Sequence, residues 1–273
     1  YPDRIVIGSN EKKSFNIMRK LYSPLISKGA KFFTTSRRGA ELIKYASNAF
    51  LATKITFINE LANLCEKSGV NIEDISLGMG SDSRIGGRFL RAGPAYGGSC
   101  FPKDTKGLVS AAEKFKINLS VVKSVIKSNY DRVNLLTNRI HKILGSNLKN
   151  KKISFLGVTF KPNTDDMRDS TSLKMIPYLS KKGALINYYD PSGEKKEFKK
   201  IRNCFFKKNI ISNCINADLI ILLTEWDEFK TIDFKKIVRN NKFKVYDLRN
   251  LYSAKDMKKK KIKYYSVGRP NFK

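Results

Sequence analysis

The second half of the chain alternates short apolar runs with segments of helical periodicity, and this rhythm limits the fold more than any other feature. Residues 219–223 are apolar without interruption, as expected for a strand buried on both faces of a parallel sheet. Strands that alternate with helices predict a doubly wound α/β domain, which binds ligands beyond the carboxyl ends of its strands. The predicted strands and helices are 152–156, 170–182, 185–189, 210–215, 219–224, 234–239, 245–248 and 264–267.

The residues before this domain have a mainly helical pattern. Residues 40–67 and 119–144 contain no glycine or proline and carry apolar residues at helical spacing, which predicts two long helices. Asn71 can cap a shorter helix over 72–77, and a glycine-rich loop is expected over 78–98. Near the start, two short strands at 4–8 and 31–35 flank one helix over 11–27. We therefore divide the chain into residues 1–36, 37–147 and 148–273.

A cysteine follows a glycine-rich turn in the middle of the chain. Gly97 and Gly98 permit backbone angles and close approaches that a side chain forbids, and Pro102 suits the first turn of a helix. Cys100 would then lie at a helix N-terminus with Lys103 one turn away, and both features favour the thiolate. The alternative is a structural thiol, because free cysteine is among the most buried residue types.

Basic residues follow two of the predicted strands. Lys161 and Arg168 lie in the loop after the strand 152–156, and Arg249 follows the strand 245–248. Because the carboxyl ends of parallel strands share one edge, we expect these side chains to converge as a phosphate clamp facing the thiol. Any one of them alone could be ordinary surface charge. No GxGxxG follows a strand in this sequence, so the usual dinucleotide-binding signature is missing from it.

Composition narrows the range of partners. Lys and Arg number 54 against 24 Asp and Glu, a formal charge of +30 that makes an anionic partner worth considering. The dense run 258–261 has no interleaved aromatic residues, and no zinc-finger or helix-turn-helix pattern is present, so we expect a solvated surface and no nucleic-acid partner. No apolar run approaches the roughly 20 residues that span a bilayer, so we expect no membrane partner.

The cysteines and the single histidine exclude other chemistry. The four cysteines form no CxxC pair, and His141 is alone, so we expect no metal site. The chain opens without a signal-peptide pattern, which favours reduced thiols in the cytoplasm.

Several separated segments resemble one known family. They are Gly-Gly-Ser-Cys-Phe-Pro-Lys-Asp at 97–104, Glu-Leu-Ile-Lys-Tyr-Ala-Ser-Asn-Ala-Phe at 41–50, Arg-Ile-Gly at 84–86, Phe-Lys-Pro-Asn-Thr-Asp-Asp-Met-Arg at 160–168 and Thr-Glu-Trp-Asp at 224–227. Together they resemble the UDP-glucose/GDP-mannose dehydrogenases, and among these the bacterial UDP-glucose 6-dehydrogenases. The resemblance implies two NAD-dependent oxidations that convert UDP-glucose to UDP-glucuronate. It also implies that residues 1–36 are the last edge of a truncated NAD-binding Rossmann domain, 37–147 a helical dimerisation domain and 148–273 a Rossmann-like UDP-binding domain.

The resemblance assigns roles to four residues of the helical part. Cys100 would capture the aldehyde as a thiohemiacetal, which a second oxidation converts to a thioester. Lys44 and Asn48, four residues apart on one helix face, would hold the reacting oxygen. Asp104 would position or activate the water that hydrolyses the thioester.

The resemblance also implies ligand-binding residues and a homodimer, in which Arg84 reaches the neighbouring active site. It assigns NAD contacts to Lys103 and Arg168. It leaves a GDP-mannose or UDP-N-acetylhexosamine dehydrogenase as close alternatives, and a non-catalytic basic binding module is a third. The residues that it assigns to UDP-glucose are Arg84, Phe89, Arg91, Tyr96, Gly97, Phe160, Lys161 and Arg249.

Overall fold

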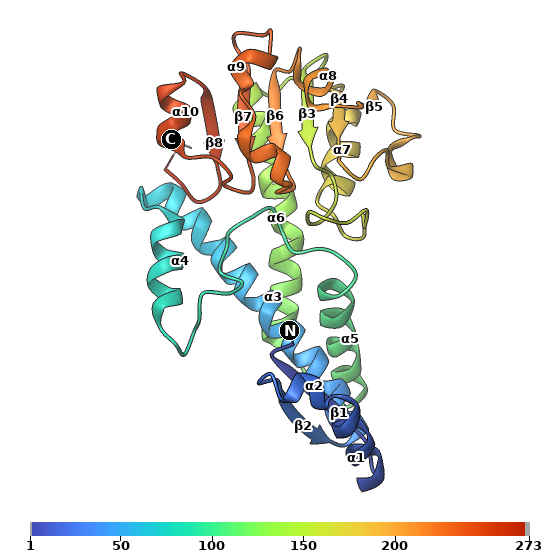
Figure 1. Ribbon diagram of the computed structural model, residues 1–273. Helices are drawn as coiled ribbons and strands as arrows, with labels where there is room; N and C mark the ends of the chain where they lie inside the picture. Colours follow the sequence, from blue (N-terminus) through green and yellow to red (C-terminus); the bar gives the residue numbers. More distant parts are fainter. Residues whose placement is uncertain (1, 271–273) are drawn as a thin grey trace.

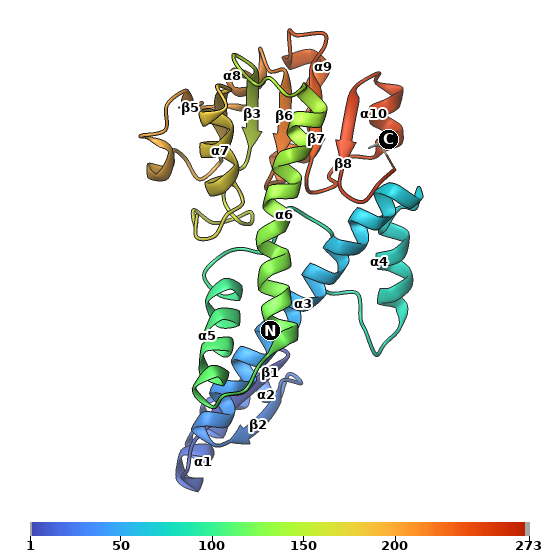
Figure 2. The same cartoon turned by 180° about the vertical axis from the view of Figure 1, so that it is seen from behind.

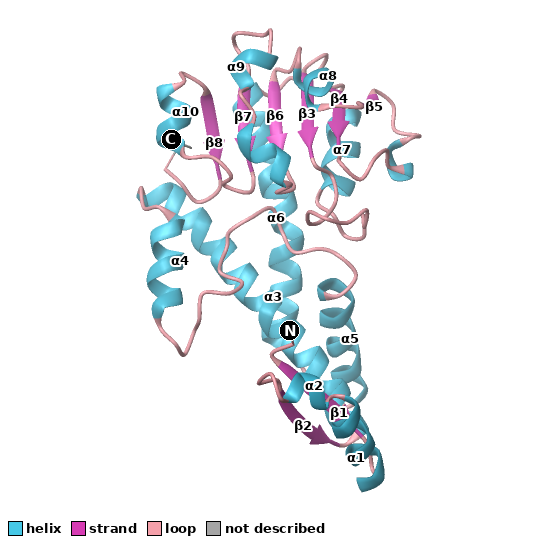
Figure 3. Ribbon diagram, in the orientation of Figure 1, coloured by secondary structure: helices cyan, strands magenta, loops and turns pink. Residues whose placement is uncertain are grey.

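The computed structural model describes residues 2–270, and its C-terminal half is built on a six-stranded parallel sheet (Figure 1). The strand order is β5-β4-β3-β6-β7-β8, which confirms the predicted doubly wound topology. Because the six strands of this sheet are parallel, their carboxyl ends share the edge that faces the helical part (Figure 3). The strands are β3 (Lys152–Leu156), β4 (Leu185–Tyr189), β5 (Cys204–Phe206), β6 (Leu219–Leu222), β7 (Lys244–Asp247) and β8 (Lys263–Ser266).

Helices cover both faces of this sheet, as the uninterrupted apolar strands require. Residues that alternate along β6 belong to different cores. Leu219 and Ile221 pack toward the long helix α6 (Ser120–Leu144), whereas Ile220 and Leu222 pack with Phe229 and neighbouring residues on the other face. The covering elements of this half are α7 (Ser172–Lys181), η1 (Lys196–Phe198), α8 (Ile210–Cys214), η2 (Asp227–Thr231), α9 (Phe234–Ile237) and α10 (Ala254–Lys259).

Two long helices carry the middle of the chain. Helix α3 (Arg37–Ser68) ends at Gly69, which has the left-handed φ of 82° typical of a helix C-terminus. Helix α5 (Phe101–Lys114) packs beside it, and α6 (Ser120–Leu144) crosses α3 and continues upward against the parallel sheet (Figures 1 and 2). Because α6 belongs to both halves, one hydrophobic core runs without a break from α3 to the sheet.

Helix α4 (Ile72–Ser81) begins as predicted and ends later than predicted. The Asn71 side chain accepts a hydrogen bond from the Glu73 amide, which confirms the cap. The helix then continues through two glycines of the expected loop, so the prediction that it stops at Leu77 was wrong. A Cβ on Gly80 would lie 2.8 Å from the Gly87 Cα, so glycine here allows two segments to cross closely and does not end the helix.

The first residues form a small parallel pair of strands. The two predicted strands are present: β1 (Arg4–Gly8) pairs with β2 (Lys31–Thr35), and both contact α3. The connecting helix is divided into α1 (Lys12–Leu21) and α2 (Ser23–Ile26), so the single helix predicted over 11–27 was wrong. Pro24 explains the division, because proline cannot continue the hydrogen-bond ladder of a helix.

The segment after β8 joins the two halves. The Gly268 amide donates to the Glu66 carboxylate at 2.8 Å, and its carbonyl accepts from the Ile72 amide at 2.9 Å. Glu66 is 3% exposed and is paired with Arg139 of α6. Burial raises the pKa of Glu66 in spite of the opposing charge of Arg139. A second ion pair, Arg269 with Glu73, closes the same joint at 2.5 Å.

Candidate active site

The thiol predicted to be reactive is accessible. Cys100 is the N-cap residue of α5, Pro102 lies in the first helical turn, and the thiol is exposed. The structural, buried alternative for this cysteine is therefore wrong. The Ser99 hydroxyl lies 3.6 Å from the Cys100 Sγ. Of the other cysteines, Cys204 is half-buried, and burial raises the pKa of its thiol to about 12, so it is far less reactive.

A buried carboxylate lies one turn into the same helix. Asp104 is 2% exposed and accepts a hydrogen bond from Asn48 at 2.5 Å and from Lys103 at 2.7 Å. The Lys44 amine lies 3.6 Å from the same carboxylate. Burial by itself would raise the pKa of Asp104, but the bonds from Lys103 and Asn48 outweigh it and hold the pKa below its usual value. Lys44, Asn48 and Asp104, which we predicted to act together, are thus brought together by α3 and α5.

The glycines before Cys100 rest on the α/β half. The Gly98 amide donates to the Arg168 carbonyl at 2.7 Å. A Cβ on Gly98 would lie 2.6 Å from the Phe160 ring, and one on Gly97 would lie 2.4 Å from the Asp169 carbonyl oxygen. Only glycine fits these contacts. Residues 97–100, which we call the thiol loop, therefore pack directly against the loop after β3.

Residues 89–96, which we call the strap, run between the helices and the sheet toward this loop. The Tyr96 ring is buried and meets Phe101 edge to face, with centroids 6.1 Å apart. Phe89 lies at the same distance from Phe101 on a left-handed backbone of φ 66°. Arg91 donates to the Arg249 carbonyl at 2.9 Å. The structure therefore places three of the predicted substrate-binding residues on one segment that leads into Cys100.

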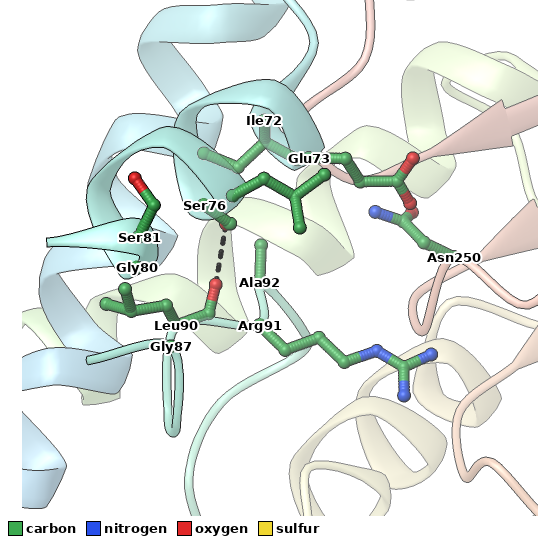
Figure 4. A pocket seen from close by; sticks show the side chains of 11 residues that line it. Ile72, Glu73, Ser76, Gly80, Ser81, Gly87, Leu90, Arg91, Ala92 and Asn250 are labelled. Carbon is green, nitrogen blue, oxygen red and sulfur yellow. Dashed lines mark hydrogen bonds between the residues drawn. The ribbon is translucent and has the colours of Figure 1, made fainter. Parts of the chain in front are cut away.

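A cavity of about 660 Å³ borders the strap on its α4 side (Figure 4). Leu90 and Ala92 line it together with Ile72, and the Ser76 hydroxyl donates to the Leu90 carbonyl at 2.7 Å. Arg91 and Asn250 also line this cavity, and the Arg91 side chain extends from the strap toward the side on which Asn250 lies (Figure 4). Cys100 is not among the residues that line this cavity.

The predicted phosphate clamp is only partly formed. Lys161 is exposed, and Arg168 is exposed and paired with Asp166 at 2.8 Å. Arg249 is instead directed inward: its guanidinium donates to the Leu223 and Phe160 carbonyls at 2.8 and 2.9 Å and pairs with Glu225. Burial lowers the pKa of Arg249. Arg249 thus braces the loop that carries Phe160.

The two residues predicted to contact NAD share the exposed side of the thiol loop. The pKa of Arg168 is raised chiefly by its bond to Asp166 and slightly by Cys100, and that of Lys103 chiefly by Asp104 and slightly by Cys100. The side chains of Arg168 and Lys103 are 69% and 71% exposed. Two exposed cations beside an accessible thiol suit the anionic groups of a dinucleotide.

Arg84 lies away from Cys100 within the same chain. It follows α4 in an exposed turn and pairs with Asp82 at 2.7 Å. This turn lies on the side of the helical part away from the start of α5 (Figures 1 and 2). Arg84 is thus not brought to Cys100 within one chain.

Three residues that hold the strap were not predicted. They are Asn59 of α3 and Asn129 and Arg132 of α6, and each bonds to strap backbone atoms. Helical periodicity places them on inward faces, and a polar residue at an inward position is the only signal that could have identified them.

Within residues 2–270, no group of three or more His, Cys, Asp or Glu is arranged to hold a metal ion. In the same range, no helix has both the length and the apolar character needed to cross a bilayer.

Two family models match the chain. Residues 38–131 match the central domain of the UDP-glucose/GDP-mannose dehydrogenase family, and residues 154–254 match its UDP-binding domain. The chain is 46% identical to a UDP-glucose 6-dehydrogenase of Rickettsia felis over 98% of its own length and 60% of the relative's. A Rhizobium meliloti enzyme of the same name is 42% identical over 99% of this chain and 62% of the relative. The chain thus spans about 60% of the length of these curated relatives.

Solved structures agree on the fold. A UDP-glucose dehydrogenase from Pyrobaculum islandicum superposes with a TM-score of 0.86 at 29% identity, over 98% of this chain and 59% of that one. A UDP-D-ManNAc dehydrogenase from Pyrococcus horikoshii, at 23% identity, gives a TM-score of 0.81 over 99% of this chain and 61% of that one. At that identity the second likeness concerns the fold alone.

Proposed function

Because the chain belongs to the UDP-glucose/GDP-mannose dehydrogenase family, we propose that it supplies the thiol-bearing and sugar-nucleotide-binding parts of an NAD-dependent UDP-glucose 6-dehydrogenase. Such an enzyme oxidises the C6 alcohol of UDP-glucose to the carboxylate of UDP-glucuronate. The observation that carries the proposal is the exposed Cys100 at the start of α5, the helix that carries the buried Asp104 carboxylate one turn further on. The proposal includes the division into an NAD-domain edge (1–36), a central domain (37–147) and a UDP-binding domain (148–273).

Two exposed cations fit the cofactor that this chemistry needs. NAD, when bound, accepts the hydride released in each of the two oxidations. Lys103 and Arg168 would hold its anionic groups, since both are exposed on the Cys100 side of the site.

Cys100 accounts for the retention of the aldehyde between the two oxidations. Its thiolate attacks the aldehyde carbon, so that a C–S bond forms and the carbonyl oxygen becomes negative. The Lys44 amine and the Asn48 amide, which both lie near Asp104, would stabilise that oxygen. Oxidation of the thiohemiacetal leaves a thioester.

Asp104 accounts for the release of the product. Its low pKa keeps it ionised at neutral pH, so it can accept a proton from a water molecule that attacks the thioester carbon. The C–S bond then breaks, the carboxylate leaves, and Cys100 returns as the thiolate. No histidine is required, in keeping with a chain whose one histidine is His141 on α6.

The strap and the loop after β3 are the proposed walls of the sugar-nucleotide pocket. Arg249 contributes by holding the Phe160 carbonyl. Lys161 remains exposed for a phosphate. The remaining proposed contacts, from the strap and the thiol loop, are Phe89, Arg91, Tyr96 and Gly97.

We also propose that two copies of the chain associate through α3, so that Arg84 of one copy completes the site of the other. Leu42, Phe50, Phe57 and Leu64 lie on one face of α3 and are between 48% and 67% exposed. An apolar groove of about 580 Å³ adjoins this face. Monomeric proteins rarely expose so continuous an apolar surface. Phe57→Asp should give monomers in sedimentation, whereas Phe205→Asp, which changes a similarly exposed residue of the α/β half, should not.

The catalytic proposal is tested by Cys100→Ser in the complete enzyme, with Cys204→Ser as the matched control. We expect NADH formation with UDP-glucose to fall by orders of magnitude in the first variant and to stay unchanged in the second. Undiminished turnover of Cys100→Ser would refute the nucleophile. Assays with GDP-mannose and UDP-N-acetylhexosamines decide the substrate, and a clear preference for either would overturn UDP-glucose. Salt-dependent DNA binding without affinity for UDP-sugars would favour the basic binding module.

A further inference from the structure

Side chains of α3 and α6 bond to the strap at two residues, Gly93 and Tyr96. At each of these residues both the backbone amide and the backbone carbonyl are bonded. The Gly93 amide donates to the Asn59 Oδ1 at 2.9 Å, and the Gly93 carbonyl accepts from the Arg132 Nε at 2.7 Å. The Tyr96 amide donates to the Asn129 Oδ1 at 2.9 Å, and the Tyr96 carbonyl accepts from the Asn129 Nδ2 at 3.0 Å. A single asparagine thus pairs with Tyr96 as a neighbouring strand would.

These anchors are themselves fixed. Asn59 is 2% exposed and Arg132 is 5% exposed. A second guanidinium nitrogen of Arg132 donates to the Asn59 carbonyl at 2.9 Å. Burial lowers the pKa of Arg132 to about 10, which still leaves it protonated and able to donate at neutral pH. Neither anchor can rotate away without leaving buried polar groups unpaired, which is costly.

The opposite side of the strap faces the α/β half. Arg91 is bonded to the Arg249 carbonyl, and a Cβ on Gly93 would lie 3.4 Å from the Arg249 guanidinium. The residue after Tyr96 begins the glycine turn that ends in Cys100. One side of the strap is therefore bonded to α3 and α6. Its other side faces the proposed sugar-nucleotide pocket, and its C-terminal end leads to the Cys100 thiol.

We propose that Asn59, Asn129 and Arg132 are positioning residues that set the strap, and through it the Cys100 thiol and the sugar-nucleotide pocket, in the reactive arrangement. This inference rests on the proposed function. None of the three side chains needs to touch a ligand. Displacement of reacting groups by about 1 Å can cost on the order of a hundredfold in rate, so a loosened strap should be visible in kinetics.

Asn129→Ala in the complete enzyme is the main test, because it removes both bonds to Tyr96. Thr137→Val is the control: Thr137 is a buried polar residue of the same helix, and within the described chain its hydroxyl bonds only to the Val133 carbonyl of that helix, whereas Asn129 is half-buried. Asn129→Asp keeps the acceptor for the Tyr96 amide and should restore part of the loss.

Three quantities are measured for each variant: kcat/KM and KM for UDP-glucose, the melting temperature, and the rate of Cys100 alkylation by iodoacetamide. Alkylation is followed by mass spectrometry on the protein without substrate. For Asn129→Ala we expect kcat/KM to fall by about ten- to a hundredfold, with an altered alkylation rate. Thr137→Val should lower the melting temperature to a similar extent and leave both other quantities unchanged.

The inference is overturned if Asn129→Ala keeps the wild-type kcat/KM and alkylation rate, or if Thr137→Val lowers kcat/KM equally. A change in only one of the two quantities for Asn129→Ala also contradicts it. The alkylation rate needs no substrate, so it tests positioning even if the unmodified enzyme fails to oxidise UDP-glucose. That failure would refute the proposed function alone.

Discussion

Gly268→Ala is the sharpest test of the joint between the two halves. Gly268 has a φ of +70°, and an added Cβ would lie 2.4 Å from the Ile72 Cγ2 and 2.9 Å from the Ala62 Cβ. Ile72 is 1% exposed, and a β-branched side chain in a helix has essentially one χ1 rotamer. Ala62 has no side-chain torsion that could relieve the contact. The added methyl group can therefore be accommodated only by separating the segment after β8 from α3 and α4.

The expected cost is the sum of two effects. A left-handed backbone costs a residue with a Cβ about 1–2 kcal/mol, and overfilling a packed core costs about 1–3 kcal/mol. Together they predict that Gly268→Ala lowers the free energy of unfolding by about 2–5 kcal/mol. Gly69→Ala isolates the first effect, because Gly69 has a φ of +82° and an added Cβ would meet no neighbouring segment of the described chain within 4 Å.

Thermal unfolding followed by circular dichroism measures both variants. For chains near this size, each kcal/mol lowers the melting temperature by about 2–4 °C. Gly69→Ala should therefore melt about 2–8 °C below the parent chain, and Gly268→Ala about 4–20 °C below it. Equal decreases for the two variants would refute the close contact at the joint.

Three further outcomes are expected. Gly98→Ala places a Cβ 2.6 Å from the Phe160 ring and should lower kcat/KM about tenfold or more. An unchanged kcat/KM would contradict the close packing of the thiol loop against the loop after β3. The pKa of Asp104 is lower folded than unfolded, so the stability it contributes is present above about pH 4 and is lost as the pH falls further. Urea unfolding of Asp104→Asn and the parent should therefore converge in acid. Glu66→Ala leaves Arg139 buried without its carboxylate and should cost about 3–5 kcal/mol in urea unfolding, and a cost below about 1 kcal/mol would contradict the buried pair.

Local patterns predicted the elements whose burial is decided by the chain's own periodicity. The uninterrupted apolar run 219–223 predicted a central parallel strand, and β6 has cores on both faces. The thiol at a helix start was likewise predictable, because the turn glycines and Pro102 act through local backbone geometry. Both are features that adjacent residues determine.

Contacts between distant residues decided the rest. Gly80 was assigned to the loop 78–98, but it lies in α4, because Gly87 crosses the helix there at close range. Arg249 looked like a phosphate ligand, but it is turned inward by carbonyls from two other loops. A basic residue at a strand end has the same local sequence whether it faces a ligand or a backbone carbonyl, so no local pattern could distinguish the two.

The bond between Glu66 and Gly268 spans 202 residues of sequence, which bears on how the chain folds during synthesis. A ribosome releases the helices of the central part, with the Glu66–Arg139 pair, long before it releases Gly268, whose amide also bonds to Glu66. Domains generally fold as units from the N-terminal end. Helices α3 and α6 therefore form while the Glu66–Arg139 pair is still exposed to water. The docking of the two halves therefore cannot be completed until the segment after β8 has been synthesised, and the binding of that segment is a late step of assembly.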